Sequence, residues 1–279
     1  MKNTKGRTVA FLLLGGLLFL RFVILAGGAF FGPPKWVSPT FEVGTYLLTT
    51  LLIWWERKRL ADFHIDRLAL LFIILFKPLE TVILFFWGLP SPLALPHWPA
   101  FLIWAIAIGL LVALLISRPS VTPVSKSSLK WIGIGLLAGL GTVLLLGFPM
   151  SLQIDSAVLA NGPGGRAMLV QAFVGFFYQI GYAAVSEEPL FRGFLWGYLK
   201  GVRWKDWWIW LFQAGLFMLG HLYYINTYPI SFWVIVPVCS LVLGWLACRS
   251  RTIASSMVAH ATINALGFTV GYLIAVFLR

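Results

Sequence analysis

Long apolar stretches recur along the whole chain and alternate with short segments that carry most of the lysine and arginine residues. Each stretch is close to the roughly 20 residues that an α-helix needs to cross about 30 Å of hydrocarbon. The pattern predicts an all-α fold, a polytopic transmembrane bundle of about eight or nine helices around a polar cavity. The predicted helices span residues 8–31, 39–55, 67–89, 99–117, 131–149, 172–200, 207–228, 232–248 and 253–277.

The composition of the chain excludes an ordinary soluble domain. Hydrophobic residues make up 60% of the 279 positions and charged residues 11%, and the mean hydropathy is +0.90. Soluble domains hold about 25% charged residues. We therefore expect an integral membrane protein that crosses the bilayer several times.

Basic residues occupy alternate connections between the predicted helices. They precede the first helix, beginning with Lys2, and recur at 57–59, 118–130, 200–205 and 249–251, whereas the connections 90–98 and 223–231 contain no Lys or Arg. The positive-inside rule then predicts a cytosolic N-terminus and, for nine helices, an external C-terminus.

The formal net charge of +12 follows from this topology. It predicts an affinity for anionic lipids. No basic domain stands outside the predicted membrane segments, so we do not expect nucleic-acid binding. The alternating charges fit a bacterial or archaeal inner membrane and also an endoplasmic reticulum membrane. The short connections and the lack of a targeting tail favour a prokaryotic inner (cytoplasmic) membrane.

Three clusters of ionisable or amide side chains interrupt the apolar C-terminal third. They are Glu187 and Glu188 with Arg192, His221 four residues after Phe217, and His260 four residues before Asn264. Ionisable groups are costly in hydrocarbon, so clusters inside membrane helices indicate a functional site. Counting from the basic ends of the helices at 1.5 Å per residue places them roughly 12–24 Å along the axes. We therefore expect one polar layer between the cytosolic face and the midplane.

Helical spacing predicts contacts within these clusters. Glu188 and Arg192 stand at i and i+4 and are expected to form an ion pair, while Glu187 points about 100° away around the helix. Pro189 lies between them and cannot donate to the carbonyl of Val185, which predicts a kink.

Other charged residues allow simpler interpretations. Lys77 and Glu80 stand at i and i+3, which predicts a local ion pair. Arg21 is alone in the first helix, where it would meet a carboxylate of the bundle or extend to an interface. His64 and His97 lie in connections and are expected at the solvated surface.

The three clusters carry a family resemblance. Residues 187–192 read EExxxR, residues 217–221 read FxxxH and residues 260–264 read HxxxN. The chain resembles the CPBP family of intramembrane proteases (CAAX protease and bacteriocin-processing, also called Abi), which includes the type II CAAX prenyl endopeptidases. The resemblance covers roughly residues 170–275. It divides the chain into N-terminal transmembrane helices of unassigned role, 1–165, and CPBP-like catalytic helices, 166–279.

The resemblance implies hydrolysis of a peptide bond by a water molecule activated within the membrane. Glu187 would act as general base, His221 would place or polarise the water, and His260 with Asn264 would stabilise the oxyanion. Glu188, Arg192 and Phe217 would support these groups, and no cofactor is expected.

Two alternatives stay open at this point. Glu187, His221 and His260 would also make a plausible zinc site of two histidines and one carboxylate. The same polar groups could serve a non-catalytic membrane scaffold or immunity protein. The expected substrate is a membrane-anchored protein or peptide. A prenylated CAAX tail, a leader peptide and the transmembrane tail of a surface protein are the candidates, and a prokaryotic origin favours leader or C-terminal processing over prenyl tails.

Overall fold

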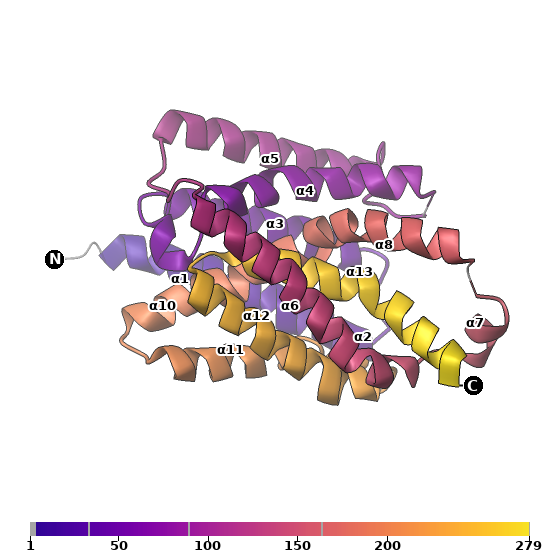
Figure 1. Ribbon diagram of the computed structural model, residues 1–279. Coiled ribbons are helices and arrows are strands. Elements are labelled where there is room, and N and C mark those ends of the chain that lie inside the picture. The colour runs from indigo at the N-terminus through magenta and orange to yellow at the C-terminus, as the bar shows by residue number, and fades with distance from the viewer. Residues whose placement is uncertain (1–3, 33, 89, 163, 279) are drawn as a thin grey trace.

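The computed structural model describes residues 4–32, 34–88, 90–162 and 164–278, and every regular element within these ranges is helical (Figure 1). Lys2, the first residue used for the predicted orientation, lies outside them, as does residue 89 at the predicted end of the third helix. Each of the nine predicted helices has a helical counterpart among the described residues. The predicted all-α bundle is confirmed.

The N-terminal half contains five long helical units, here called rods, each made of one helix or of consecutive helical segments without a break. The first combines α1 (Thr4–Phe19), the π-helix η1 (Leu20–Gly27) and α2 (Gly28–Phe30). The others are α3 (Val37–Trp55), α4 (Arg67–Phe86), α5 (Trp98–Ser117) and α6 (Lys126–Ser151), with the 3₁₀ turn η2 (Leu60–Phe63) between α3 and α4.

The C-terminal half begins with the short helix α7 (Ser156–Ala160). A continuous rod follows, made of α8 (Gly165–Gln179), the π-helix η3 (Ile180–Ala184), α9 (Val185–Glu188), the π-helix η4 (Pro189–Leu195) and α10 (Trp196–Gly201). The remaining elements are α11 (Asp206–Leu219), the 3₁₀ turn η5 (Leu222–Tyr224), the π-helix η6 (Ser231–Ile235), α12 (Val236–Ser250) and α13 (Ile253–Leu278).

Seven of the described helical segments are long and apolar enough to cross a membrane, so the protein is an integral multi-pass membrane protein. α3 and α11 are not among the seven. The predicted helix 207–228 is wrong at its C-terminal end, because α11 stops at Leu219. Fourteen residues span about 21 Å, less than the hydrocarbon core. The apolar sequence continues past Gly220, so hydrophobicity alone did not reveal where the helix ends.

Helix α13 lies at the centre of the bundle and packs against α6, α8 and α12 (Figure 1). Its contact with α6 depends on glycine. A β-carbon at Gly135 would lie 2.3 Å from the carbonyl oxygen of Ser255, and one at Gly139 would lie 2.8 Å from that of Ala259. Such small residues let two membrane helices approach closely. The close approach fixes the position of α13, which carries His260.

The basic connections meet at one end of the bundle, here called the basic face (connections 56–66, 118–125, 200–205 and 249–252). Backbone hydrogen bonds join three of them: Ser120 N–H donates to the Arg57 carbonyl (2.9 Å), Arg67 N–H to Thr122 (3.2 Å) and Ile253 N–H to His64 (2.8 Å). The prediction that His64 is solvated is wrong, because it is buried among these connections. Burial lowers the pKa of the His64 imidazole to about 4, so the ring is neutral at pH 7.

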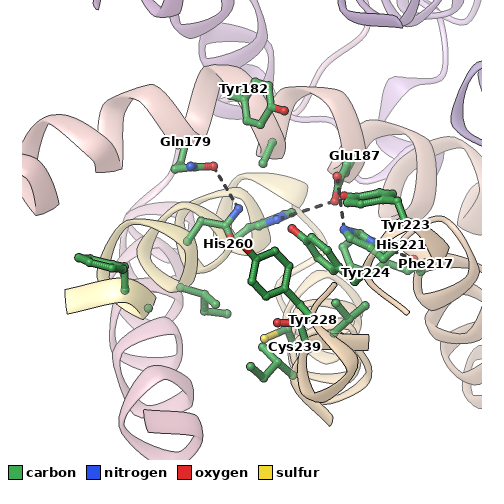
Figure 2. A pocket seen from close by; sticks show the side chains of 18 of the residues that line it. Gln179, Tyr182, Glu187, Phe217, His221, Tyr223, Tyr224, Tyr228, Cys239 and His260 are labelled. Atoms are coloured by element: carbon green, nitrogen blue, oxygen red, sulfur yellow. Dashed lines mark hydrogen bonds and ion pairs between the residues drawn. The ribbon is translucent and has the colours of Figure 1, made fainter. Parts of the chain in front are cut away.

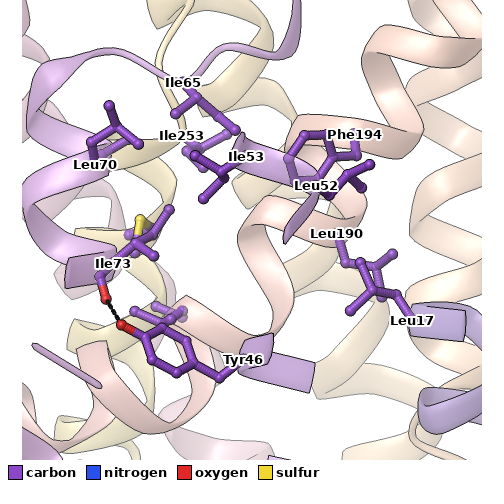
Figure 3. Packing of buried hydrophobic residues seen from close by; sticks show 14 of the residues in the cluster. Leu17, Tyr46, Leu52, Ile53, Ile65, Leu70, Ile73, Leu190, Phe194 and Ile253 are labelled. Carbon is purple, nitrogen blue, oxygen red and sulfur yellow. Dashed lines mark hydrogen bonds between the residues drawn. The ribbon is translucent and has the colours of Figure 1, made fainter. Parts of the chain in front are cut away.

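The opposite face is formed by connections 152–164 and 220–231. The backbone N–H and the hydroxyl of Ser231 both donate to Gln153 Oε1, at 3.3 and 3.1 Å, which ties the two connections together. Between the two faces, and nearer the basic one, lies an apolar core to which α1, α3, α4, α5, the α9–η4 segment and α13 contribute residues (Figure 3). Tyr46 reaches the Ile73 carbonyl within this core, with a hydrogen bond of 3.0 Å (Figure 3).

Candidate active site

The structure brings three predicted site residues from three separate helical regions to one place (Figure 2). Glu187 lies on α9, His260 lies on α13 and His221 follows the end of α11. Glu187 Oε1 is 3.9 Å from His221 Nε2, and Glu187 Oε2 is 3.8 Å from His260 Nε2. All three side chains line a cavity of about 670 Å³. Both distances are too long for direct hydrogen bonds between the carboxylate and the imidazoles.

The hydrogen-bond partners of His260 determine which of its ring nitrogens carries the proton. His260 Nδ1 lies 2.9 Å from Glu188 Oε1, so an N–H at Nδ1 donates to this carboxylate. In the neutral imidazole the other nitrogen, Nε2, then carries a lone pair directed at Glu187. Glu187 Oε2 has no hydrogen-bond partner among the described residues, although it is buried. Glu187 therefore lines the cavity and keeps one buried carboxylate oxygen unpaired beside the His260 ring.

His221 is held in the same tautomer by its own helix end. Its Nδ1 lies 2.8 Å from the Phe217 carbonyl and donates to it, which leaves the lone pair on Nε2. The Phe217 ring supports the imidazole at 4.6 Å between ring centroids. Both imidazoles thus present an unprotonated nitrogen to Glu187, an arrangement in which a water molecule can donate one hydrogen atom to an imidazole and the other to the carboxylate.

The predicted ion pair between Glu188 and Arg192 is confirmed, at 3.2 Å, with both side chains fully buried. Arg192 also donates to the Ser240 hydroxyl (2.8 Å) and carbonyl (3.2 Å) on α12. Its guanidinium carbon lies 4.3 Å from the centre of the Phe217 ring. Glu188 therefore joins Arg192 to His260, and Phe217 packs against the same arginine.

Arg21 lies at the site, although the sequence did not indicate it as a site residue. Its Nη2 lies 2.7 Å from Glu187 Oε1, so the predicted carboxylate partner exists and is the candidate base itself. The same nitrogen lies 3.2 and 3.4 Å from the two ring nitrogens of His221, nearly equal distances that place it over the ring rather than in line with either lone pair. A single arginine in an apolar helix indicated that Arg21 meets a carboxylate inside the bundle or extends to an interface. The sequence could not show that its partner is Glu187.

The contact of Arg21 with Glu187 requires a glycine at the end of α11. A β-carbon at Gly220 would lie 2.9 Å from Arg21 Nε and 3.3 Å from its Cγ. We expect Gly220→Ala to displace the guanidinium and lower kcat/KM about 10-fold, which corresponds to roughly 1.4 kcal/mol. Gly215→Ala on the same helix meets no atom within 4 Å and should leave kcat/KM unchanged. Equal rates for the two variants in a peptide cleavage assay would contradict a role for Arg21.

π-helical segments surround the cavity. Arg21 lies on η1, Tyr182 on η3 and Ser231 on η6, and all three residues line the cavity, while η4 carries Arg192. Single-turn π segments widen a helix and are frequent at functional sites. At η4 the local cause is Pro189, which has no N–H to continue the α-helical hydrogen bonds. The predicted disturbance at Pro189 thus takes the form of a widened turn.

Asn264 lies one helical turn beyond His260 and lines the same cavity, where its side chain is exposed. Its Nδ2 donates to Gln179 Oε1 at 3.1 Å (Figure 2). The other amide hydrogen of Asn264 is not used by this bond. Gln179, at the end of α8, was not predicted as a site residue.

A second buried cluster adjoins the site. Lys77 lies 2.8 Å from Glu80, which confirms the predicted pair, and it also contacts Glu42 on α3. Glu42 lines the cavity together with Phe41 and Arg21, so helices of the segment 1–165 form part of its wall. The N-terminal helices, to which sequence assigned no role, therefore contribute directly to the candidate site.

A metal ion would meet an existing cation at this place. Among the described residues, no group of three or more His, Cys, Asp or Glu side chains has an arrangement that could hold a metal ion. Arg21 already contacts both Glu187 and His221, two of the three ligands considered for zinc. A divalent cation there would have to displace the guanidinium or bear its repulsion.

Comparison with known proteins agrees with the motifs. Residues 169–266 match the family model described as type II CAAX prenyl endopeptidase Rce1-like, which confirms the resemblance inferred from sequence. The matched range includes the three motifs, and Arg21, Glu42 and Lys77 lie outside it. No curated protein and no solved structure matches the chain. The family indicates a peptidase of the CAAX-type intramembrane kind.

Proposed function

We propose that this chain, whose residues 169–266 match the model of a family of CAAX-type peptidases, is an intramembrane endopeptidase that uses Glu187 to activate water. The substrate would be a membrane-anchored protein or peptide, cleaved in its leader or C-terminal tail. The observation that supports this most directly is the Glu187 carboxylate at the cavity, which lies 3.8 and 3.9 Å from two imidazole Nε2 atoms and whose buried Oε2 has no hydrogen-bond partner among the described residues. We further propose a prokaryotic cytoplasmic membrane with a cytosolic N-terminus and anionic lipids at the basic face.

In the first step Glu187 Oε2 accepts a proton from a water molecule that His221 Nε2 orients. The resulting hydroxide attacks the carbonyl carbon of the scissile peptide bond. Arg21 holds Oε1 of the same carboxylate, so Oε2 is the oxygen left free to take the proton. General-base catalysis of this kind contributes about 10²–10⁴-fold to the rate.

In the second step the proton moves to the leaving amine. Glu187 can pass it to His260 Nε2, 3.8 Å away, and Glu188 stabilises the imidazolium through Nδ1–H. His260 then protonates the amide nitrogen as the C–N bond breaks, and both residues return to their starting charge. The unused N–H of the Asn264 amide is available to the oxyanion of the tetrahedral intermediate.

A cleavage assay separates this mechanism from its alternatives. The purified protein in liposomes is offered a fluorogenic CAAX-type peptide and a panel of membrane-anchored reporter proteins, with and without 1,10-phenanthroline. We expect cleavage of at least one reporter at a rate that the chelator does not change. Loss of cleavage on chelation, with recovery on added Zn²⁺, would replace the glutamate mechanism with a zinc mechanism. No cleavage by a folded protein would favour a scaffold.

A further inference from the structure

The cavity is open toward the opposite face of the bundle. Asp155 and Tyr228, from connections 152–164 and 220–231, line it and are exposed. Glu187, His221 and His260 line it too but are only 5–7% exposed. The cavity therefore has its mouth among the connections of the opposite face and its floor at the candidate catalytic groups.

The helices that line the cavity confirm this direction. α1 begins at the basic face, and its continuation lines the cavity through Leu25, two residues before the end of η1. α3 runs the other way and contributes Phe41 from its first turns, and α6 contributes Met150 from its last turn. In each rod the lining residue is near the end that lies at the opposite face.

Toward the basic face the catalytic groups are covered by packed aromatic side chains. Phe191, Phe194 and Trp196 on η4 and α10 are at most 1% exposed. The Phe191 ring lies 5.2 Å from that of Phe217, and the Phe194 ring lies 5.2 Å from that of Phe63, a residue of the basic connection 56–66. Figure 3 shows Phe194 packed among aliphatic side chains of this core. A peptide cannot cross such a layer without unpacking it.

The distribution of lysine and arginine residues indicates which face of the bundle lies on which side of the membrane. The basic face carries Arg57, Lys58, Arg118, Lys205 and Arg251. At the opposite face, connections 152–164 and 220–231 contain no Lys or Arg, and the basic residues among the described ones are Lys35, between α2 and α3, and Arg166, in the first turn of α8. The positive-inside rule places the basic face in the cytosol. The mouth of the cavity then faces away from the cytosol.

We infer that the substrate reaches Glu187 from the extracytoplasmic side of the membrane. Given the proposed peptidase function, the substrate is a protein whose scissile bond lies at the extracytoplasmic end of its membrane anchor. The mouth is rimmed by Tyr223, Tyr224, Tyr228 and Phe268 and by one carboxylate, Asp155. An aromatic rim of this kind fits an extended segment without acidic side chains.

This direction differs from the cytosolic layer expected from sequence. That expectation counted along an unbroken helix from Lys205 to Tyr228. α11 ends at Leu219, and His221 lies beyond it, in the connection of the opposite face. The site therefore lies at the C-terminal end of α11, on the side of the bundle away from Lys205 and the basic face.

Thiol labelling tests the direction without requiring a substrate. Cys239→Ala and Cys248→Ala remove the native thiols, and Asp155→Cys, Tyr228→Cys or Lys205→Cys then adds one. The proteins are expressed in the inner membrane of a Gram-negative host with a permeabilised outer membrane and treated with a membrane-impermeant maleimide. We expect the Asp155→Cys and Tyr228→Cys proteins to be labelled equally before and after lysis. The Lys205→Cys control should be labelled only after lysis. The reverse pattern would overturn the inference and leave the proposed peptidase intact.

Reporter cleavage adds a functional readout. One membrane-anchored reporter carries the cleaved segment outside the cytosol and its matched partner carries it inside, each with wild-type protein or Glu187→Gln. We expect Glu187-dependent cleavage of the first reporter alone. Cleavage of the second alone would contradict the inferred direction. If neither is cleaved, the proposed function fails, while the labelling pattern still decides which face the cavity opens to.

Discussion

Glu187→Gln should abolish peptide cleavage and leave the fold unchanged. The amide has nearly the same shape, and its oxygen can still accept from Arg21, 2.7 Å away in the wild-type protein. It cannot accept a proton from water, so the general-base contribution of about 10²–10⁴-fold in kcat/KM is lost. The measurement is kcat/KM on the reporter that the wild-type protein cleaves, with circular dichroism and thermal unfolding recorded in the same detergent.

The matched control for this variant is Asp62→Asn. It makes the same carboxylate-to-amide change at an exposed side chain of the basic face, outside the cavity. Its kcat/KM should equal that of the wild-type protein. Undiminished cleavage by a folded Glu187→Gln protein would show that Glu187 is not the general base that the family resemblance implies.

Arg192→Met should produce the largest loss of stability. Arg192 and Glu188 are both fully buried, and the variant leaves the Glu188 carboxylate without its guanidinium partner. Breaking a buried ion pair from one side costs about 3–5 kcal/mol in the free energy of unfolding. Ser240 also loses two hydrogen bonds from the arginine. Reversible unfolding in mixed micelles, followed by tryptophan fluorescence, measures the change.

Two companion variants show whether an unpaired charge is the cause. Adding Glu188→Gln to Arg192→Met removes the buried carboxylate that has lost its cationic partner and should recover part of the stability. Lys200→Met breaks an exposed pair with Asp206, with side chains 50% and 34% exposed, and should cost less than about 1 kcal/mol. Similar losses for Arg192→Met and Lys200→Met would mean that burial of the Glu188–Arg192 pair does not carry the predicted energy.

The sequence by itself determined the elements of the bundle and the contacts within single helices. Apolar length set the number of rods, because each membrane helix must satisfy its own backbone hydrogen bonds and cover the hydrocarbon. Spacing of four residues set the pair between Glu188 and Arg192, and spacing of three set the pair between Lys77 and Glu80, since such residues share a helix face. The three motifs also singled out Glu187 as the candidate base and predicted the match to the family model.

Only the tertiary structure decided how the rods meet. Arg21 pairs with Glu187 across 166 positions of sequence, and Glu42 joins Lys77 from a different helix. No local spacing encodes such contacts, because they depend on the rotation and close approach of helices that glycines such as Gly135 and Gly220 permit. The end of α11 at Leu219 and the direction in which the cavity opens also follow from packing, since an apolar sequence is compatible with a helix or with a buried connection.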